Sequence, residues 1–553
     1  AASCMVAAGV VPKWSVAEPS ASDPGEQGAA AFAVESLSSH DLNVARRASL
    51  VSIRQQLEQG SVADPIVMQL LSFEDSATVE LRGSCVSGLL RRGARVFTSS
   101  AGTEKDFNAS QPRAKLRHFI SHNWSVPRWR KYIALIWHFN LIPAALAGLV
   151  ACLLGVALTS AGAFPVVVDI LYSNQIRGTA CRVLCAPSML CTLFWYRDLQ
   201  HALGIGGPSA FLDKTCIHQV NMDKQRAGIK KLGAYLNSSD EMVILYTDLY
   251  LQKVWTAYEL ATSIVLKETD KLHVIPIIMP LVLTIAVVVL YFSGLLTIVF
   301  TAHGIKFGLM IGVILPSLVF IFALRKWARD LETMRKRLAC FKCEDLHCAC
   351  EEDRPLVYGN ISGLMRAAGL APAGTSELTA LRAFELMVRR LLPDILSTSI
   401  GQVGLSYSAS LVVGAALIVP WMCDNISARP PSRLTVVLGL LSLTYIMSLI
   451  PLVIALCMKM ARCCFHLAGC KENAYVTAIW VTAMLACAAG VLSLNVLVQK
   501  ALVSDLWLVI LTVVMLTSTV LALVVYGCIS VRACVVNVAR KRSETEGEDE
   551  ECN

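Results

Sequence analysis

The densest group of metal-ligand side chains in this chain of 553 residues is a cluster of cysteines followed closely by a histidine. The cluster consists of one pair, Cys340 and Cys343, and a second pair, Cys348 and Cys350, with His347 directly before the second pair. Four soft ligands of this kind can surround a zinc ion as a tetrahedron. The second pair is spaced more tightly than in a standard zinc knuckle, and no second Cys-x2-Cys pair follows. The alternative is a set of reduced thiols, acylated where they lie near a bilayer.

Two histidines follow apolar, strand-like segments and are candidates for general bases. His122 comes after the run Leu116–Ile120, and His218 comes after the run that starts at Phe211. Neither histidine has an obvious cysteine or serine nucleophile partner in the sequence. A lone histidine beside a strand is more often a hydrogen-bonded structural residue, so that interpretation stands as the alternative for both.

The elements that would position these side chains form an alternating α/β pattern. The expected strands are 116–121, 211–217, 241–247 and 271–278, and the expected helices are 229–237 and one that contains Trp255 and Glu259. Continuous apolar runs of this length are typical of strands that are covered on both faces. Strands alternating with helices favour a parallel sheet. The first two strands are separated by about ninety residues that contain an uncharged run.

Four pieces of this pattern, taken in order, resemble the Toll/interleukin-1-receptor (TIR) family. Phe119-Ile120-Ser121-His122 resembles the motif of the family's first strand, and Phe211-Leu212-Asp213-Lys214 resembles its second strand. Met242 to Thr247 resembles the third strand, and Trp255-x-x-x-Glu259-Leu260 resembles the motif that carries the catalytic glutamate in NAD-cleaving members. The resemblance covers about 100 residues outside the insert.

The resemblance implies a flavodoxin-like parallel sheet with its site at the carboxyl ends of the strands. In family members that are enzymes, a glutamate faces the ribose as nicotinamide departs, and its carboxylate stabilises an oxocarbenium-like transition state. Glu259 would take that catalytic role, with NAD as the substrate. The residues expected to bind the dinucleotide are Ser121, His122, Trp124, Asp213 and Trp255. The segment Thr215–Arg226 resembles the loop that mediates contact between TIR domains.

Two features of the sequence differ from the family pattern. The usual Trp-Cys pair is Trp255-Thr256 in this chain. The fourth expected strand, 271–278, runs without a linker into an apolar segment, so the last helix and fifth strand of the fold are missing at that point. The sheet is therefore expected to be truncated, or completed by another part of the chain.

The composition indicates an integral membrane protein. Hydrophobic residues make up 55% of the chain, charged residues make up 16%, and the mean hydropathy is +0.57. The apolar residues form blocks of about 18 to 26, the length that crosses a hydrocarbon core as a helix. The formal net charge of +8 comes from Lys and Arg that gather beside these blocks, so we expect the lipid bilayer and not nucleic acid as a partner. The twenty scattered cysteines are expected to be reduced, and the first residues lack the basic region of a signal peptide.

We expect about eight membrane crossings, in a polytopic α-helical domain. The predicted organisation is a disordered segment 1–37, a small helical region 38–110, a split TIR-like domain 111–139 and 207–278, a membrane hairpin 140–206, a transmembrane pair 279–325, a cytosolic Cys-containing helical linker 326–402, four transmembrane helices 403–532 and a basic-then-acidic tail 533–553. The TIR-like region and the tail are expected to be cytosolic, because the longest Lys- and Arg-rich loops fall on their side. The sequon at Asn425 would then face the opposite side.

Three functions remain open on the sequence alone. The first is signalling by self-association or association with other TIR domains, which the resemblance favours most. The second is hydrolysis of NAD by Glu259. The third is transport, but away from the ends of the third to eighth apolar segments we find essentially no ionisable side chains of the kind that ion-coupled carriers need. Asp169, in the insert, is the one candidate for such a group.

Overall fold

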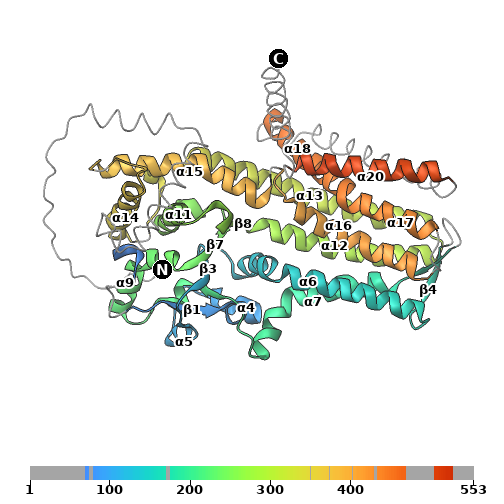
Figure 1. Ribbon diagram of the computed structural model, residues 1–553, viewed down its shortest axis with the longest axis horizontal. Coiled ribbons are helices and arrows are strands. Elements are labelled where there is room, and N and C mark those ends of the chain that lie inside the picture. Colours follow the sequence, from blue (N-terminus) through green and yellow to red (C-terminus); the bar gives the residue numbers. More distant parts are fainter. Residues whose placement is uncertain are drawn as a thin grey trace, which may run out of the picture. The chain divides into compact units, whose positions relative to one another are not determined.

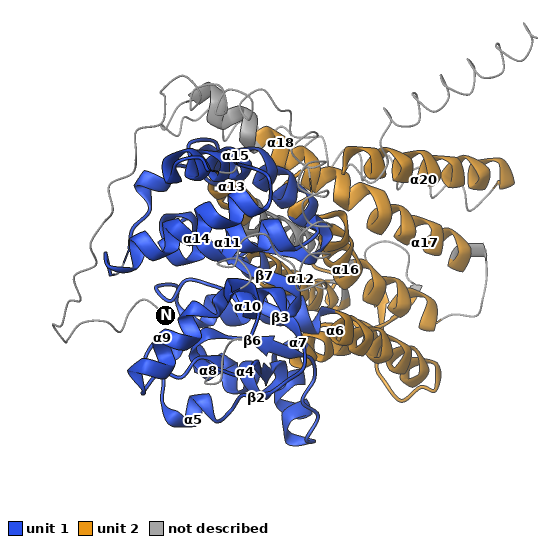
Figure 2. Ribbon diagram, turned by 60° about the vertical axis from the view of Figure 1, so that its left-hand side comes forward, with its two compact units in different colours: residues 1–141, 193–281, 333–399 blue, residues 142–192, 282–332, 400–553 orange. Residues whose placement is uncertain are grey.

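The computed structural model describes residues 69–73, 79–169, 175–348, 350–372, 374–401, 403–428, 433–468 and 504–526. The chain divides into two compact units (Figure 2). Unit 1 comprises residues 1–141, 193–281 and 333–399, and unit 2 comprises residues 142–192, 282–332 and 400–553. Four expected features lie wholly or partly outside the described residues: the disordered segment 1–37, residues 38–68 and 74–78 of the helical region 38–110, the apolar segment 474–498 and the tail 533–553.

Unit 1 is built on a six-stranded, mostly parallel sheet. Its strands are β1 (Arg82–Cys85), β2 (Gln111–Pro112), β3 (Leu116–Ser121), β6 (Ser209–Phe211), β7 (Ser239–Tyr246) and β8 (Leu272–Pro276). Their order is β2-β1-β6-β3-β7-β8. Strands β6, β3, β7 and β8 are parallel to their neighbours, whereas β1 pairs antiparallel with both β6 and β2. The expected α/β sheet is therefore confirmed as a parallel-dominated sheet with helices.

The central strands are apolar along their whole length because both faces of the sheet are covered. In β7, Met242 and Val243 point to opposite faces, and both side chains are completely buried. Phe119 of β3 stacks on Phe211 of β6, with ring centroids 4.5 Å apart. Tyr235 of the following helix packs against Phe211 at 4.5 Å and thereby joins the sheet to its helical layer.

Two local predictions are corrected by the structure. The second strand was predicted to run over 211–217, but β6 ends at Phe211, and Asp213–Cys216 form the short helix α8. This turn forms because the amides of Thr215 and Cys216 both donate to the carbonyl of Leu212. Within the region predicted to be helical, Arg82–Cys85 instead forms strand β1.

Helices and short helical turns cover the sheet of unit 1 (Figure 1). They are α4 (Val86–Ala94), η1 (Arg95–Thr98), α5 (Glu104–Phe107), α9 (Met222–Lys230), α10 (Leu232–Asn237), η2 (Tyr250–Gln252), α11 (Val254–Leu266), η3 (Thr269–Lys271), η4 (Cys343–Asp345), α14 (Asp353–Ala367) and α15 (Glu377–Ile400). Helix α11 is apolar on nearly all sides, which is typical of a buried helix. Helix α14 packs against α11. Residues 333–399, expected as part of a linker, thus share a unit with the sheet.

Unit 2 contains most of the apolar helical segments. The helices that lie wholly or partly in it are α6 (Arg128–Ser160), α7 (Ala180–Ala202), α12 (Ile278–Ala302), α13 (Lys306–Ala339), α16 (Tyr407–Ser427), α17 (Arg433–Thr444), the π-helical turn η5 (Tyr445–Leu449), α18 (Ile450–Ala468) and α20 (Asp505–Val525). Five helices in the described residues are long and apolar enough to cross a membrane: 128–160, 278–300, 407–427, 435–460 and 505–525. The chain therefore has the features of an integral membrane protein.

Unit 2 contains an ion pair that was not predicted from the sequence. The Asp424 carboxylate is completely buried, and its Oδ2 lies 2.8 Å from Arg182 Nε. Its two oxygens also accept the backbone amides of Cys181, at 2.8 Å, and Arg182, at 3.1 Å. This pair links α7 to α16 within unit 2. Asp169, the residue singled out from sequence, lies in strand β4 (Val166–Asp169), which pairs with β5 (Gln175–Gly178) between α6 and α7.

Replacing Asp424 with asparagine is expected to destabilise unit 2. The substitution leaves the partly buried Arg182 guanidinium without its counter-charge, and removing one member of a buried pair costs up to about 3 kcal/mol. Thermal unfolding in detergent measures the effect as a lowered midpoint. A double variant, Asp424→Asn with Arg182→Leu, removes both charges and should recover part of the loss. A single variant as stable as the wild type would contradict this assignment.

The side chain of the sequon residue Asn425 is also buried. It is 2% exposed, and its Nδ2 donates to the carbonyl of Trp421 at 2.7 Å. In the folded chain this side chain is therefore packed away from solvent. A test of membrane orientation is therefore better made with a cysteine or a sequon introduced at an exposed position.

Candidate active site

The polar residues expected from sequence meet at one edge of the unit 1 sheet. Strand β3 ends at Ser121 and continues into the turn that holds His122 and Trp124. Asp213 opens α8 just after β6, the neighbour of β3. Because β3 and β6 are parallel, their carboxyl ends lie side by side, which is where open α/β sheets hold their ligands. Helix α11 contributes Glu259 to the same place.

Glu259 is held by a hydrogen-bond chain that starts on the sheet. The Ser121 hydroxyl donates to Glu259 Oε2, and the two residues are 138 positions apart in the sequence. The same hydroxyl lies 2.7 Å from the hydroxyl of Tyr250, which is completely buried. Glu259 keeps part of its surface on a cavity while protein surrounds the rest of its side chain. The carboxyl group is thus fixed in position by one short polar chain.

The surroundings of Glu259 favour its neutral form. Burial raises the pKa of Glu259 to about 8, and the negative charge of Asp213 acts in the same direction. The hydrogen bond from Ser121 opposes this shift because it stabilises the carboxylate. At pH 7 Glu259 is therefore mostly protonated, and a positive charge brought into the cavity would favour its ionisation.

Asp213 is held on the other side of the cavity by Trp124. The indole Nε1 of Trp124 donates to Asp213 Oδ2 at 2.8 Å. This hydrogen bond stabilises the ionised carboxylate. The ammonium of Lys131, whose side chain is completely buried, lies 4.8 Å from the centroid of the Trp124 ring and 5.5 Å from that of Phe97. Local sequence does not mark Lys131 as a residue of the site, because residues 127–138 have the pattern of an amphipathic helix.

His122 is packed as an aromatic residue. Its ring meets Trp124 edge-on at 4.6 Å and Phe97 edge-on at 5.1 Å between centroids. Burial lowers the pKa of His122 to about 3, with the nearby charge of Lys131 adding to the effect and that of Asp213 opposing it. The imidazole is therefore neutral at physiological pH. This environment favours the structural interpretation of His122 over a role as general base.

His218, the second histidine candidate, lies in a separate structural contact. Its Nε2 is 3.1 Å from Glu104 Oε1, and its Nδ1 accepts the backbone amide of Asn221 at 3.0 Å. The ring also packs against Phe107, with centroids 4.7 Å apart. His218 thus connects α5 to the loop before α9 and does not line the cavity at Glu259.

The residues at this sheet edge enclose a cavity of about 160 Å³. Its lining residues are His122, Asn123, Trp124, Ser125, Asp213, Ile217, Ile229, Leu232, Lys253, Val254, Trp255, Thr256, Glu259 and His347. Of the six expected site residues, five line the cavity, and Ser121 reaches it through Glu259. The indole Nε1 of Trp255 donates to Asp353 Oδ2 at 3.2 Å, so this ring is anchored to α14. Lys253 adds a positive charge to the lining.

His347 joins the site from a distant part of the chain, and the sequence analysis did not place it there. Its amide donates to the carbonyl of Gln252 at 2.7 Å, and its carbonyl accepts the amide of Val254 at 3.3 Å. His347 and Lys253 form a parallel β-bridge. The segment that follows α13 thus covers the start of α11. A local motif cannot reveal this, because the contact depends on how the chain returns from the membrane part.

The cysteine cluster is not arranged as a metal site. No group of three or more His, Cys, Asp or Glu side chains that could hold a metal ion occurs in the described part of the chain. Cys340 is exposed and Cys343 is buried, and the Cys348 thiol donates to the carbonyl of Cys350 at 2.8 Å. Burial raises the pKa of the Cys343 thiol, with Glu385 acting in the same direction.

Comparisons of this chain with protein-family models, with curated proteins and with solved structures find no match.

Proposed function

We propose that this chain is an integral membrane protein whose unit 1 is a TIR-like domain that hydrolyses NAD and releases nicotinamide, with Glu259 as the catalytic carboxylate. The observation that carries the proposal is the position of Glu259. Its carboxyl group accepts a hydrogen bond from Ser121 and lines a cavity that Trp255 and Asp213 also line. Sequence alone favours association as the function. The convergence of acidic, aromatic and hydroxyl side chains around one cavity supports the hydrolase instead.

The strand order supports a truncated flavodoxin-like sheet. If the parallel strands β3, β6, β7 and β8 are numbered 1 to 4 along the chain, their order across the sheet, β6-β3-β7-β8, is 2-1-3-4. This order matches the first four strands of the flavodoxin-like arrangement 2-1-3-4-5. Helix α12 begins at Ile278, two residues after β8 ends, so a fifth strand does not follow at that point. We propose that the antiparallel strands β1 and β2 extend the opposite edge.

We also propose about eight crossings, with unit 1 and the tail in the cytosol. Three crossings would add to the five candidate spans: the return segment of the 140–206 insert, the segment 307–324 and the segment 474–498. An even number of crossings in the insert is required, since residues on both sides of it belong to the same sheet. The asymmetry of Lys and Arg between the loops supports this orientation.

The proposed reaction breaks the bond between the nicotinamide nitrogen and the ribose C1′. The leaving group takes the bonding electron pair and becomes neutral nicotinamide, while positive charge grows on the ribose ring. Ionised Glu259 would stabilise this charge as carboxylates do in glycosidases. Water then forms a bond to C1′ and releases a proton, which gives ADP-ribose. The cationic nicotinamide ring of bound NAD would itself favour ionisation of Glu259, whose pKa is about 8 in the empty site.

The size of the cavity restricts what it can enclose. A volume of about 160 Å³ is smaller than that of pockets that enclose whole drug-sized ligands, which are on the order of 300–1,000 Å³. The cavity therefore suits only the nicotinamide and ribose end of NAD. The rest of the dinucleotide would lie outside, where the ammonium of Lys253 can approach a phosphate.

The function is tested by comparing NAD with NADH as substrates for the protein in lipid nanodiscs. Nicotinamide release from NAD, with ADP-ribose formed in equal amount, is the expected result. NADH should be cleaved at least about 10²-fold more slowly, because its neutral dihydropyridine ring is a poor leaving group and brings no positive charge to Glu259. Equal cleavage of both dinucleotides, or products cut at the pyrophosphate, would overturn the proposal.

Association of unit 1 copies is the second candidate function, and one observation favours it. Val220 and Met222, in the segment 215–226, are 56% and 42% exposed. Two large apolar side chains exposed at the start of α9 are a plausible contact for a second copy, with or without catalysis. They are also the surface that the resemblance to TIR domains would use.

Replacing Val220 and Met222 together with aspartate is expected to weaken self-association at least about tenfold, since a charge must then be buried at the contact. Fluorescence energy transfer between labelled copies in one bilayer measures the effect. Leu249→Asp is the matched control, because Leu249 is an exposed apolar residue, at 41%, elsewhere on unit 1. Energy transfer unchanged in the double variant would exclude this surface as the contact.

A further inference from the structure

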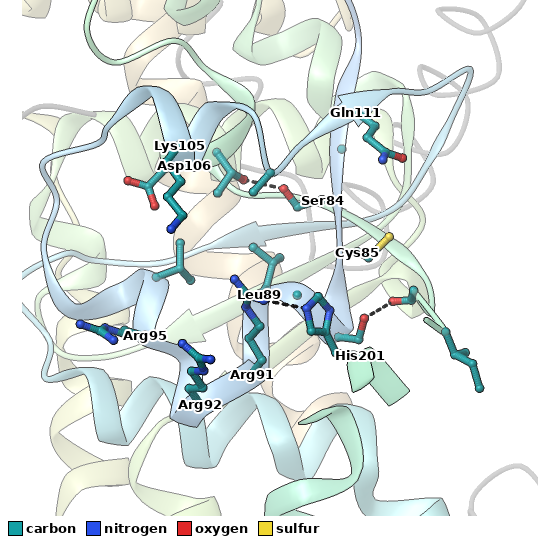
Figure 3. Close-up of a pocket in the computed structure, with 18 of the residues that line it drawn as sticks. Ser84, Cys85, Leu89, Arg91, Arg92, Arg95, Lys105, Asp106, Gln111 and His201 are labelled. Atoms are coloured by element: carbon teal, nitrogen blue, oxygen red, sulfur yellow. Dashed lines mark hydrogen bonds between the residues drawn. The ribbon is translucent and has the colours of Figure 1, made fainter. Parts of the chain in front are cut away.

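Unit 1 contains a second and larger cavity, of about 680 Å³, which is lined in part by residues of β1 and β2. Its walls come from α4, η1, α5 and the loop before β6 (Figure 3). We propose that this cavity binds a ligand that carries two or more phosphate groups. The proposal is independent of the reaction at Glu259, because none of the residues that line this cavity lines the smaller one.

Four positively charged side chains line the cavity. Arg91 and Arg92 lie at the end of α4, Arg95 begins η1, and Lys105 comes from α5. All four are exposed residues. Figure 3 shows Lys105 directed from α5 toward the turn that carries the arginines. Positive charge therefore faces the cavity from two separate walls, as a ligand with more than one anionic group requires.

The negative charges near the cavity are already engaged. Asp106 is the one carboxylate among the residues that line it, and its Oδ2 accepts the amide of Thr103 at 2.9 Å and the Thr103 hydroxyl at 2.8 Å. These bonds form the capping box of α5. Asp198, outside the lining, accepts the backbone amide of Arg92 at 2.7 Å. In the described part of the chain, neither carboxylate forms an ion pair with the side chains of Arg92, Arg95 or Lys105.

Arg91 is oriented by a histidine. Its Nη1 donates to His201 Nε2 at 2.6 Å, and His201 also lines the cavity (Figure 3). In this contact Nε2 of the imidazole is the acceptor, because a guanidinium can only donate. The remaining four donors of the Arg91 guanidinium stay available. A guanidinium held in this way can meet two oxygens of one phosphate.

The turn that carries the arginines has an uncommon backbone. Arg92, Gly93 and Ala94 have φ values of 51°, 65° and 54°, so two residues with a side chain adopt the left-handed conformation. This conformation is unfavourable for a residue with a Cβ, and such conformations gather at ligand-binding sites. The bond from the Arg92 amide to Asp198 holds the turn in this form. The geometry brings three arginines within five residues onto one wall of the cavity.

A glycine-rich loop closes the opposite wall. Residues 204–207 read Gly-Ile-Gly-Gly, and they precede β6, so they cannot form a dinucleotide loop of the kind that follows a strand. A Cβ at Gly206 would lie 2.7 Å from Cys85 Sγ, and the Ser87 hydroxyl donates to the Gly206 carbonyl at 2.7 Å. The loop is therefore packed closely on β1 and α4 and forms a fixed wall.

The volume and charge of the cavity together select the class of ligand. A cavity of about 680 Å³ lies within the range of roughly 300–1,000 Å³ for small-molecule sites. A single carboxylate would satisfy one arginine and leave the other charges uncompensated. Arginine forks match phosphate oxygens, and lysine binds phosphate as a point charge. Such phosphates occur both on soluble polyphosphates and on the headgroups of phosphorylated lipids.

The test measures binding of radiolabelled inositol hexakisphosphate to the full chain in nanodiscs of neutral phosphatidylcholine. Saturable binding is expected, and the double variant Arg92→Gln, Arg95→Gln should weaken it at least tenfold, since each lost phosphate contact is charge-assisted. Arg226→Gln is the matched control, because Arg226 is an exposed arginine of unit 1 outside the cavity. The affinity of the wild type should also fall as salt is raised.

A second arm separates the two sources of phosphate. The same measurement is made in nanodiscs that contain phosphatidylinositol bisphosphate. If inositol hexakisphosphate no longer binds to these discs, the proposal is supported with a lipid headgroup as the ligand. If it still binds, the proposal is supported with a soluble polyphosphate as the ligand. The absence of saturable binding in neutral discs, or equal binding by wild type and the double variant, would overturn the proposal.

Discussion

Replacing Glu259 with glutamine is expected to lower kcat for nicotinamide release by about 10³-fold, the order of effect seen when a preorganised charge-stabilising group is lost. Glutamine has nearly the same shape, and its carbonyl oxygen can still accept the hydrogen bond from Ser121. Substrate binding should therefore change little, and KM should stay within a few fold. The loss falls on kcat because the carboxylate charge is needed most when positive charge develops on the ribose.

Glu268→Gln is the control for this substitution. Glu268 is exposed and lies just beyond the end of α11, so the same chemical change is made near the same helix without touching the cavity. Steady-state kinetics in nanodiscs should give wild-type values for this variant. A Glu259→Gln protein that keeps kcat within threefold of the wild type would remove Glu259 from the reaction.

The dependence of the rate on pH is the second prediction with a large effect. For the free enzyme, kcat/KM should rise about tenfold per pH unit below pH 8 and level off above it. The sign follows from the form of Glu259 that is needed: the reaction uses the carboxylate, and burial raises the pKa of this group to about 8. The fraction in the carboxylate form therefore falls as the pH falls. At pH 6 the rate constant should be about 10²-fold below its plateau.

The variant Ser121→Ala tests whether the pH profile reports the pKa of Glu259, because a purely structural role of Ser121 would not shift the profile. The Ser121 hydroxyl lowers the pKa of Glu259 by stabilising the carboxylate, so its removal should shift the rising limb of the profile to higher pH. Tyr250→Phe, one step further along the hydrogen-bond chain, should shift it less. A rate that falls as the pH rises would show that the protonated acid is the active form, against the proposed mechanism.

The central strands could be predicted from sequence because each is a short apolar run that ends in polar residues. Buried parallel strands have this appearance whatever the surrounding chain does. The six candidate site residues lie together because they follow or face the ends of these strands. In contrast, β1 has only four residues, Arg82–Cys85, with no apolar alternation, and its pairing with β6 depends on residues more than a hundred positions away.

Other parts of the site depend on contacts that local patterns do not encode. His347 reaches the cavity through backbone bonds to Gln252 and Val254 after the chain has passed through two apolar helices. Lys131 reads as a residue of an amphipathic helix, yet it is completely buried against the rings of Trp124 and Phe97. A long-range packing partner decides its burial. The same is true of Asp424, which is paired with Arg182 from another helix.

The arginine-lined cavity was also beyond sequence reasoning, although its residues are close together in the chain. Arg91, Arg92 and Arg95 resemble an ordinary solvated end of a helix. What distinguishes them is the left-handed backbone at Arg92 and Ala94, which a sequence of non-glycine residues does not suggest. The facing Lys105 comes from a short helix that follows a loop.

The most direct test of the central claim is a count of nicotinamide molecules released per protein by the wild-type chain in nanodiscs at pH 8.5. Many turnovers are expected, which means far more than one nicotinamide per protein, with an equal amount of ADP-ribose. Glu259→Gln discs measured in parallel should stay near the background of empty discs. Fewer than one nicotinamide per wild-type protein, or equal release by the two proteins, would contradict the claim that Glu259 catalyses NAD hydrolysis.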